Sequence, residues 1–425
     1  MTPIKDHPLR FRLANELHAR PFPSFKAPAT VVFLAIKKQD QAAGRDRNQD
    51  IAHLIALLDR YGAPHPQPGA THYSGTIGRH NIKWEQHTEF VTYTIFSEGV
   101  EGRPFDPAAF EVFPHDWLLE APGVRVTSAM IRIEQKTTNE EVLKNMRDWF
   151  VPESMACSYV LDESAVVAGD FRVDPAGHLR FAILPSESCG PGRIGRITQR
   201  ICEIETYKAM SMLGFFRARD MAARTGEIEV ELSRLMDDMT GDVEPEKTLD
   251  GLLAISQELE AAIARSSYRF GATKAYSALV KQRIQVLRET PFVARQSFGE
   301  FMMRRFDPAM RTIEASQDRL NQLADRSIRA SELLRTKVDV KRSDQNQELL
   351  ASMDKRARTA LRLQETVEGL SVVAISYYAV SLAGYLFSPL ASVMGISKNS
   401  LIAGLTLPVV ALVWLMIRRI KSRLH

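Results

Sequence analysis

Cysteine and its metal-binding motifs are scarce in this chain. Among 425 residues only Cys157, Cys189 and Cys202 occur, an odd number without CxxC or Cys/His ligand spacing. Such a set is typical of ordinary thiols in a reducing compartment and predicts neither a disulfide framework nor a structural zinc site. We therefore expect no metal site and no cofactor.

The chain also has no large excess of positive or negative charge. The 55 lysines and arginines nearly balance the 51 acidic residues, and no basic block interleaved with aromatic residues occurs, so we expect no nucleic-acid partner. The motifs HExxH, GxxxxGK[ST] and GxSxG are absent. The grouping of His115, Asp116 and Glu120 is more typical of solvated loop residues than of an active site. We therefore expect that the protein is not an enzyme and has no catalytic residue.

Long apolar segments occur only near the C-terminus, and they predict that the protein is located in a membrane. The first apolar run, residues 31–36, is too short and too late for a signal peptide. Near the C-terminus, Lys398 alone separates two apolar segments, 370–387 and 401–417. A helix needs about 17 to 25 residues to span a bilayer. Both segments are near the lower end of this range. We expect a two-helix transmembrane hairpin, with a buried core hairpin as the alternative.

Flanking charge predicts the orientation of this hairpin. The basic residues are Lys355, Arg356, Arg358 and Arg362 before the first segment, and Arg418, Arg419, Lys421 and Arg423 after the second. Because cytoplasmic flanks carry an excess of lysine and arginine, we expect both termini in the cytoplasm. The predicted location is the cytoplasmic (inner) membrane, with the lipid bilayer as a partner.

Residues 1–190 mix strand-like and helical patterns and predict an α+β cytoplasmic domain with a mixed or antiparallel sheet. Amphipathic spacing predicts helices at 46–61 and 139–150, the second with an asparagine N-cap, and proline and glycine predict a loop at 62–70. Branched and aromatic residues predict strands at 30–36, 87–96, 124–133, 155–161, 165–173 and 178–184.

Residues 191–368 predict a helical, coiled-coil stalk domain, which is followed by the transmembrane hairpin and basic tail of residues 369–425. Helix formers with apolar spacing of three and four replace the strand patterns. Prolines predict new helix starts at Thr290 with Pro291 and at Asp307 with Pro308. No further proline occurs until residue 389, so the sequence allows one helix to run into the first apolar segment.

A repeated apolar seam in the stalk predicts self-association. Its residues recur at steps of three, four and seven, as in a helical bundle: Leu349, Met353, Ala360, Leu363, Val367 and Leu370. The polar stretch DVKRSDQN, residues 339–346, interrupts the seam and predicts a hinge or an exposed turn. We expect a homo-oligomer.

The stretch HPLRFRLANELHARP, residues 7–21, predicts a helix rather than a metal site. Pro8 is placed to start it with His7 as the cap, and Pro21 to end it. His7 and His18 would lie about 16 Å apart along the axis, too far to share one metal. The spacing of Leu9, Leu13 and Leu17 predicts docking on the sheet, and that of Arg12, Glu16 and Arg20 predicts ion pairs. Ligand or anion sensing is the alternative.

The same stretch carries a family resemblance. HPLR, NE and HARP resemble the N-terminal signature of an uncharacterised family of bacterial membrane-anchored proteins, domain of unknown function 3422. The likeness continues through KTTNEEVLKNMRDWF and IGRITQRICEIETYKAM to the C-terminal hairpin. The signature residues are His7, Pro8, Arg10, Asn15, Glu16, His18, Arg20 and Pro21. The resemblance implies no activity, because none is assigned to that family.

The expected architecture is also similar to that of the CorA-type magnesium transporters. These combine a cytoplasmic α/β domain, antiparallel helices, a long stalk helix and a C-terminal two-helix hairpin, although a shared fold does not imply a shared function. They carry a Gly-Met-Asn motif after the first membrane helix. Here the corresponding region reads YLFSPLASVMGISKN, without that motif, so magnesium selectivity is not implied.

Small and hydroxylated residues form one stripe along the first apolar segment. The stripe consists of Ser371, Ala374, Tyr378, Ser381, Tyr385 and Ser388. It could line a narrow pore, with hydroxyls replacing part of an ion's hydration, or form a helix-packing seam. No acidic residue lies in either apolar segment, which favours packing.

A weaker pattern is SCGPGRIGR, residues 188–196, a GxGxxG sequence between a predicted strand and a predicted helix. Its glycines could approach a phosphate that Arg193, Arg196 and Arg200 neutralise. Pro191 removes one amide donor, however, and a helix follows where a second strand should be. The pattern therefore favours a connecting loop over an anion site.

Together these patterns support two functional hypotheses. The first is an oligomeric ion channel or transporter of CorA-like build, with an inorganic ion as its substrate. The alternative is a membrane-tethered scaffold or assembly factor with a cytoplasmic protein-binding domain.

Overall fold

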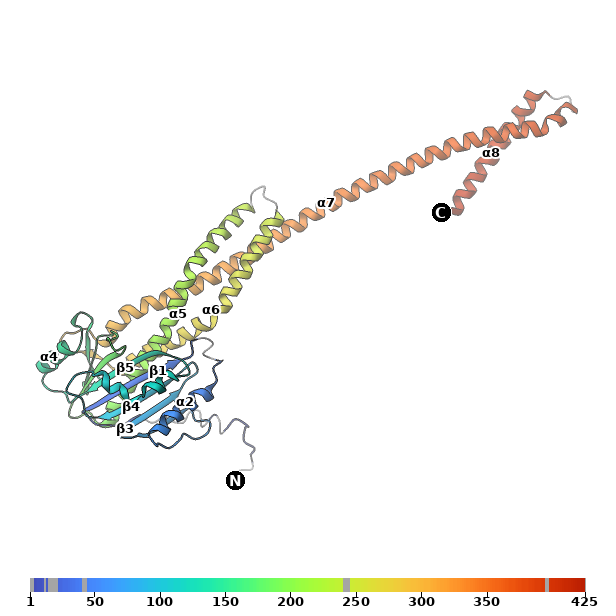
Figure 1. The fold of residues 1–425 in the computed structure, drawn as a ribbon. Coiled ribbons are helices and arrows are strands. Elements are labelled where there is room, and N and C mark those ends of the chain that lie inside the picture. The colour runs from blue at the N-terminus through green and yellow to red at the C-terminus, as the bar shows by residue number, and fades with distance from the viewer. Residues whose placement is uncertain are drawn as a thin grey trace. The chain divides into compact units, whose positions relative to one another are not determined.

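A computed structural model describes residues 4–10, 13, 22–39, 44–239, 245–393 and 397–424 (Figure 1). Contacts divide the chain into two compact units. The first unit holds residues 1–241 and 250–330, and the second holds residues 242–249 and 331–425. The predicted boundaries at 190/191 and 368/369 mark changes of sequence pattern, and they stay predictions.

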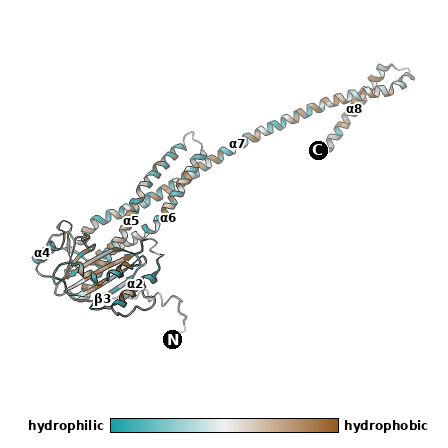
Figure 2. Cartoon of the chain, viewed as in Figure 1, coloured by the Kyte–Doolittle hydropathy of each residue, from teal (hydrophilic) through white to brown (hydrophobic). Residues whose placement is uncertain are grey.

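A nine-stranded sheet, counted over the described residues, is the centre of the first unit. Its order is β2-β3-β4-β1-β5-β8-β7-β6-β9, and every neighbouring pair is antiparallel except β5 with β8. The strands are β1 (Ala29–Lys37), β2 (His72–Ile77), β3 (His80–Gln86), β4 (Phe90–Glu98), β5 (Val124–Ile133), β6 (Ala156–Val160), β7 (Ala165–Gly169), β8 (Leu179–Pro185) and β9 (Thr290–Pro291). Figure 2 shows hydrophobic residues, in brown, along these strands.

Helices cover both faces of this sheet. On one face, Leu34 of β1 packs with Leu54 of helix α2 and Trp117 of helix α3, and farther along the same face Ala182 of β8 packs with Met146 of helix α4. On the other face, Phe33 lies against helix α5. The bounds are α2 (Arg47–Arg60), α3 (His115–Leu119), α4 (Asn139–Trp149) and α5 (Pro191–Asp238), with short 3-10 helices η2 (Pro107–Val112) and η3 (Pro152–Ser154). The predicted α+β organisation is confirmed.

The predicted strands and helices of this region are found close to their expected positions, while β2 and β3 were not predicted. The sequence of β3 does not look like a strand, because its polar residues Lys83 and Gln86 are buried. In a half-buried strand, apolar buried residues should alternate with polar exposed ones. The cap of α4 was placed one residue too late. The Thr138 hydroxyl, rather than Asn139, accepts the backbone N–H of Glu141, and Asn139 is the first helical residue.

Three long helices follow the sheet. Helices α5 and α6 (Pro245–Leu287) lie side by side with the first part of α7 (Phe298–Val393) in the first unit (Figure 1). Gly214 lets α5 approach Thr273 of α6, since a Cβ at Gly214 would lie 2.2 Å from the Thr273 hydroxyl. Ser256 of α6 and Ser327 of α7 share a hydrogen bond of 2.7 Å.

Both helix starts predicted from prolines are wrong. Thr290 and Pro291 form β9, an extended pair beside β6, because the adjacent Phe292 is anchored in the core around α4. Helix α7 begins at Phe298, where Ser297 and Glu300 bond reciprocally as a capping box. Pro308 lies inside α7, which therefore lacks one N–H donor there without ending.

The polar stretch 339–346 is helical, so the predicted hinge or turn there is wrong. Helix α7 is 96 residues long and continues through this stretch, which is exposed along its whole length. Helix α8 (Lys398–Leu424) follows in the second unit. Polar residues at these positions interrupt the apolar seam, but they do not interrupt the helix itself, because an exposed helix can be polar on all sides.

Buried ion pairs hold the turn between β3 and β4. The Arg45 guanidinium donates to the carbonyls of His87, Thr88 and Phe90 and to Asp50. The Glu89 carboxylate is 1% exposed and accepts from Arg269 of α6. This pair joins the sheet to the helices.

We expect Arg269→Leu to destabilise the first unit strongly, by about 3–5 kcal/mol, because the Glu89 charge stays buried without its partner. Thermal unfolding of the full chain in detergent measures the loss. Arg224→Leu is the matched control, since its pair with Glu258 is exposed and such pairs contribute little. Equal losses in both variants would contradict the assignment.

A neutral histidine lies in the core between α2, α3 and β4. The His53 ring stacks on Trp117 at 3.9 Å between centroids. Its Nε2 lies 3.0 Å from the Trp117 carbonyl, which can only accept, so Nδ1 accepts from the Tyr93 hydroxyl at 3.0 Å. Burial lowers the pKa of His53 below its usual range, against weaker attraction of the proton by Asp50.

We therefore expect the free energy of unfolding to fall as the pH drops below about 6.5, the ordinary histidine pKa. Below that pH the unfolded chain binds a proton at His53 that the folded chain does not bind. Burial lowers the pKa values of His80 and His178 in the same direction. Unfolding followed from pH 7.5 to 5.5 tests this. His53→Gln should make the decline shallower, and a variant as steep as the native chain would exclude His53 as a source.

Candidate functional site

Two helices in the described residues are long and apolar enough to cross a membrane. They are α7 within Phe298–Pro389 and α8 within Asn399–Arg419. In their most apolar stretches only 11% and 6% of the residues, respectively, are buried inside the chain. A core helix of a soluble domain would be mostly buried, so the alternative of a buried core hairpin is not supported.

Within the second unit α8 returns beside α7. A Cβ at Gly384 of α7 would lie 3.3 Å from Ile402 of α8, and farther along a groove lined by Ser376 and Val380 on α7 and Thr406 on α8 separates the two helices. The residues of α7 that face α8 thus recur at 376, 380 and 384. This face was not predicted, because it depends on how the two helices pair.

The predicted stripe lies mostly outside this contact. Tyr378 and Tyr385 are 68% and 71% exposed, and Ser371 and Ala374 are exposed too, while Ser381 and Ser388 are half-buried. Ser381 also lines the groove toward α8. The stripe therefore is not the main packing surface inside the helix pair.

Hydroxyls along α7 and α8 differ in their hydrogen bonding. Ser371 donates to the Val367 carbonyl at 2.8 Å and Thr406 to the Ile402 carbonyl at 2.7 Å, the usual way to satisfy such groups inside a helix. The buried Ser376 hydroxyl has no hydrogen-bond partner among the described residues. Among the buried hydroxyls in the described part of α7, it is the one without a hydrogen-bond partner.

The family-signature segment is described only in part. His7 caps the turn as predicted, with its Nδ1 accepting the N–H of Leu9 at 3.1 Å, and Arg10 pairs with Asp6. Leu9 and Leu13 are exposed, so the predicted docking on the sheet is wrong for these two. Asn15, Glu16, His18, Arg20 and Pro21 lie outside the described residues, as do Arg12 and Leu17.

The GxGxxG glycines at the start of α5 have different surroundings. A Cβ at Gly195 would lie 1.7 Å from the Pro23 carbonyl oxygen, whereas Gly190 and Gly192 have nothing within 4 Å. Gly195 is therefore the place where the backbone of the segment before β1 crosses α5. Its role in packing explains the residue without a phosphate.

The three arginines of this pattern serve mainly as links between elements. Arg193 donates to the Ser164 hydroxyl at 2.7 Å and Arg200 to the Val286 carbonyl at 3.3 Å, while Arg196 is exposed. Burial lowers the pKa of Arg200, and Arg283 and Arg196 add repulsion. Two of the three guanidinium groups thus already have protein partners.

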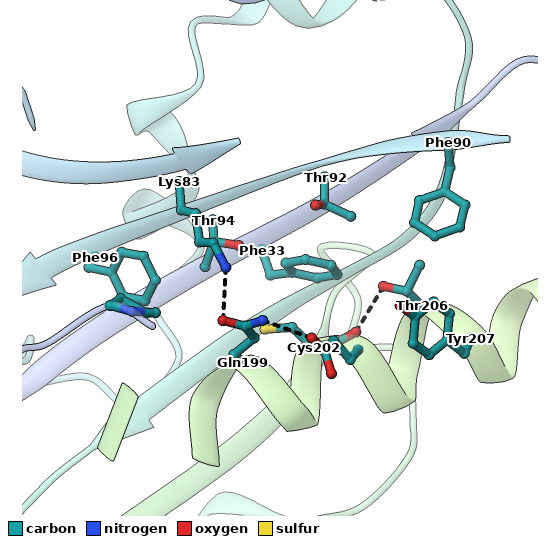
Figure 3. Close-up of a pocket in the computed structure, with 12 residues that line it drawn as sticks. Phe33, Lys83, Phe90, Thr92, Thr94, Phe96, Gln199, Cys202, Thr206 and Tyr207 are labelled. Carbon is teal, nitrogen blue, oxygen red and sulfur yellow. Dashed lines mark hydrogen bonds between the residues drawn. The ribbon is translucent and has the colours of Figure 1, made fainter. Parts of the chain in front are cut away.

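The cavity between α5 and the sheet is too small for a substrate. Figure 3 shows Lys83 of β3 donating to Gln199 of α5, at 2.8 Å, and Gln199 donates in turn to Glu203, which pairs with Arg283 of α6. The cavity beside this chain holds ≈ 20 Å³, enough for about one water. We interpret it as structural.

The remaining chemically notable groups are also structural. Cys157, Cys189 and Cys202 are buried free thiols, and burial raises the pKa of Cys157 to about 12, which removes its nucleophilic form. Asp116 pairs with Arg60 at 2.6 Å on the surface. Among the described residues no group of three or more His, Cys, Asp or Glu is placed to hold a metal ion.

Alanine substitutions separate the packing role of Gly195 from a phosphate site. Gly195→Ala should destabilise the chain by about 1–3 kcal/mol through the clash with Pro23. Gly192→Ala should leave the melting temperature unchanged or slightly raised, since alanine favours the helix. A stabilising shift with added nucleotide that both substitutions abolish would instead support a phosphate site.

The model of one protein family, described as protein of unknown function (DUF3422), matches residues 5–424. No curated protein matches the chain. Because the match covers nearly the whole sequence, the resemblance predicted from HPLR, NE and HARP is confirmed, and the chain belongs to the DUF3422 family of proteins of unknown function.

Proposed function

We propose that this protein is an oligomeric ion channel or transporter of the cytoplasmic membrane, broadly CorA-like in build. In this proposal α7 and α8 cross the bilayer as a hairpin with both termini in the cytoplasm. The order of elements supports it: an α+β region, then α5 and α6, then a 96-residue helix that ends in an apolar segment. A second apolar helix with a basic end follows.

The observation that carries the proposal is the exposure of the hydroxyl stripe. Tyr378 and Tyr385 lie outside the α7–α8 contact, where in a single inserted chain they would face hydrocarbon. Polar groups inside a bilayer generally face a bundle interior or a water-filled path. Several copies arranged around an axis would place the stripe on that path.

A path of this kind would be weakly selective. Hydroxyl oxygens can replace part of the hydration shell of a cation, but no acidic residue lies in either apolar segment. The absence of a Gly-Met-Asn sequence gives no support for magnesium selectivity. The transported species in this proposal is an inorganic ion held by neutral oxygens.

Oligomerisation is supported by the stalk part of α7. The seam residues Leu349, Met353, Leu363, Val367 and Leu370 are all more than half exposed in the single chain. Apolar side chains at heptad-like spacing lose contact with water when copies of the helix pack together. The same exposure also favours the second candidate function, a membrane-tethered scaffold whose helix packs against another protein.

Ion flux through liposomes that contain the full-length protein tests the channel. Ser381→Ala and Tyr385→Phe should each change the flux, on the order of fivefold, if loss of one hydroxyl contact removes about the net worth of a hydrogen bond. Tyr377→Phe is the comparison for Tyr385→Phe, because it makes the same change in a residue that lines the groove toward α8.

Three outcomes would count against the channel. They are absence of flux under sodium, potassium and magnesium gradients from inserted protein, a monomeric state in detergent, and equal effects of Tyr377→Phe and Tyr385→Phe. The first of these, with the protein inserted and oligomeric, would leave the scaffold as the better hypothesis.

A further inference from the structure

The apolar seam of α7 has one charged position. Between Leu349 and Leu370 the seam residues follow steps of four and three, except for a step of seven from Met353 to Ala360. Arg356 fills this step, because it lies three residues after Met353 and four before Ala360. It therefore belongs to the same helical face as the apolar seam residues, the face that loses contact with water when copies of a helix pack together.

The positions on both sides of the seam carry no charge. In two-stranded bundles these positions often hold glutamate and lysine, which pair between the helices. Here the charged residues lie on the remaining faces of α7, as with Asp354, which pairs with Arg358 at 2.7 Å. The broad uncharged face can contact a neighbouring copy on each side, which favours more than two copies. The flanking residues are Leu350, Ser352, Ala357, Thr359, Gln364 and Thr366.

The charge of Arg356 has no counter-charge nearby on its own helix. No acidic residue lies three or four positions before or after it, the spacing at which side chains of one helix pair. Its side chain is exposed in the single chain. Because the flanking positions are uncharged, a neighbouring copy that packs on this face supplies no acid from them either.

Symmetry would bring the Arg356 side chains of an oligomer together. Copies inserted in one bilayer with the same orientation are related by rotation about an axis normal to the membrane. Such a rotation keeps each residue at one height along the axis. A seam residue that faces the axis therefore forms a ring with its equivalents from the other copies.

We propose that a ring of Arg356 side chains on the axis of the stalk binds an inorganic oxyanion of the phosphate type. The inference rests on the oligomer of the proposed function, not on ion conduction. Guanidinium groups at one level repel one another, more strongly as packing excludes water. Rings of arginine bind anions and phosphate, and each guanidinium fork can donate to two phosphate oxygens.

The position of Arg356 favours a soluble anion over a lipid headgroup. Along α7 it lies about 21 Å before Leu370, where the apolar segment begins, at about 1.5 Å per residue. The headgroup layer of a bilayer is only about 5–8 Å thick on each side. In this proposal the ring is therefore in the aqueous part of the stalk.

Phosphate binding at such a ring would regulate assembly. The ring exists only when several copies of α7 are packed together, so the oligomer binds phosphate better than the single chain does. A ligand that binds one state better than another shifts the equilibrium toward that state. We expect phosphate to favour the oligomer.

Binding of radiolabelled inorganic phosphate to the full-length protein, in neutral detergent free of phospholipid, tests the ring. Equilibrium dialysis measures the bound phosphate, and light scattering measures the mass of the oligomer. We expect one phosphate for each oligomer rather than one for each chain, because all copies share the ring. Phosphate should also raise the oligomer fraction compared with chloride at equal ionic strength.

Substitutions separate the ring from the general positive charge of the stalk. Arg356→Gln should weaken phosphate binding on the order of tenfold or more, the effect of losing a hydrogen bond to a charged group. It should still assemble, because the repulsion in the seam is removed. Arg356→Lys should give intermediate binding, since lysine keeps the charge without the fork. Arg362→Gln is the matched control, because it removes the same charge about 120° around the helix from Arg356.

The possible failures are distinguishable. An oligomer that binds no phosphate would overturn the ring and leave the proposed oligomer intact. Equal weakening by Arg356→Gln and Arg362→Gln, or one phosphate for each chain, would also overturn the ring, because either result shows that the anion binds elsewhere. A monomer at every phosphate concentration would reject the ring together with the oligomer. Absence of ion flux with intact phosphate binding would reject only the channel.

Discussion

Helix α7 is the element on which both compact units depend, because its residues contribute to each of them. One backbone hydrogen-bonding pattern runs from the capping box at Ser297 and Glu300 to Val393. Cooperative propagation makes each further helical residue inexpensive once the helix has started. The chain can therefore place apolar residues for a core, polar residues for an exposed stretch and a second apolar segment on one continuous helix.

The start of α7 is fixed by tertiary contacts in the first unit. Phe292 is fully buried beside α4 and β6, and the Glu289 carboxylate accepts the N–H of Gly299 at 2.7 Å. These contacts hold the chain extended at β9 before the helix begins. Buried pairs such as Glu89 with Arg269 then attach the helices to the sheet, so the polar groups inside this unit mainly connect its elements.

This use of polar groups separates structural chemistry from candidate function. The arginines near the GxGxxG pattern, the buried cysteines and the surface pair of Arg60 and Asp116 all have structural explanations. What remains without an internal explanation is the exposed side of α7, with its seam, its hydroxyl stripe and its basic flank. The functional proposals rest on this surface.

The sequence by itself determined the elements whose pattern is local. Alternating branched residues predicted β1, β5 and β8, side-chain spacing predicted α2, and the uncharged segments around Lys398 predicted the apolar helix pair. Family membership also followed from local motifs. These features depend on periods of two or 3.6 residues and on composition, which neighbouring residues alone express.

Tertiary structure alone decided the features that depend on partners distant in the sequence. The polar residue Lys83 can be buried in β3 because it donates to Gln199 of α5, and Gly195 is required because Pro23 crosses α5. Pro308 lies inside α7 and does not end it, because contacts with neighbouring elements stabilise the helix. Likewise, which side of α7 faces α8 followed from the packing at Gly384 and Ile402, because a helical pattern shows which residues share a face but not what covers it.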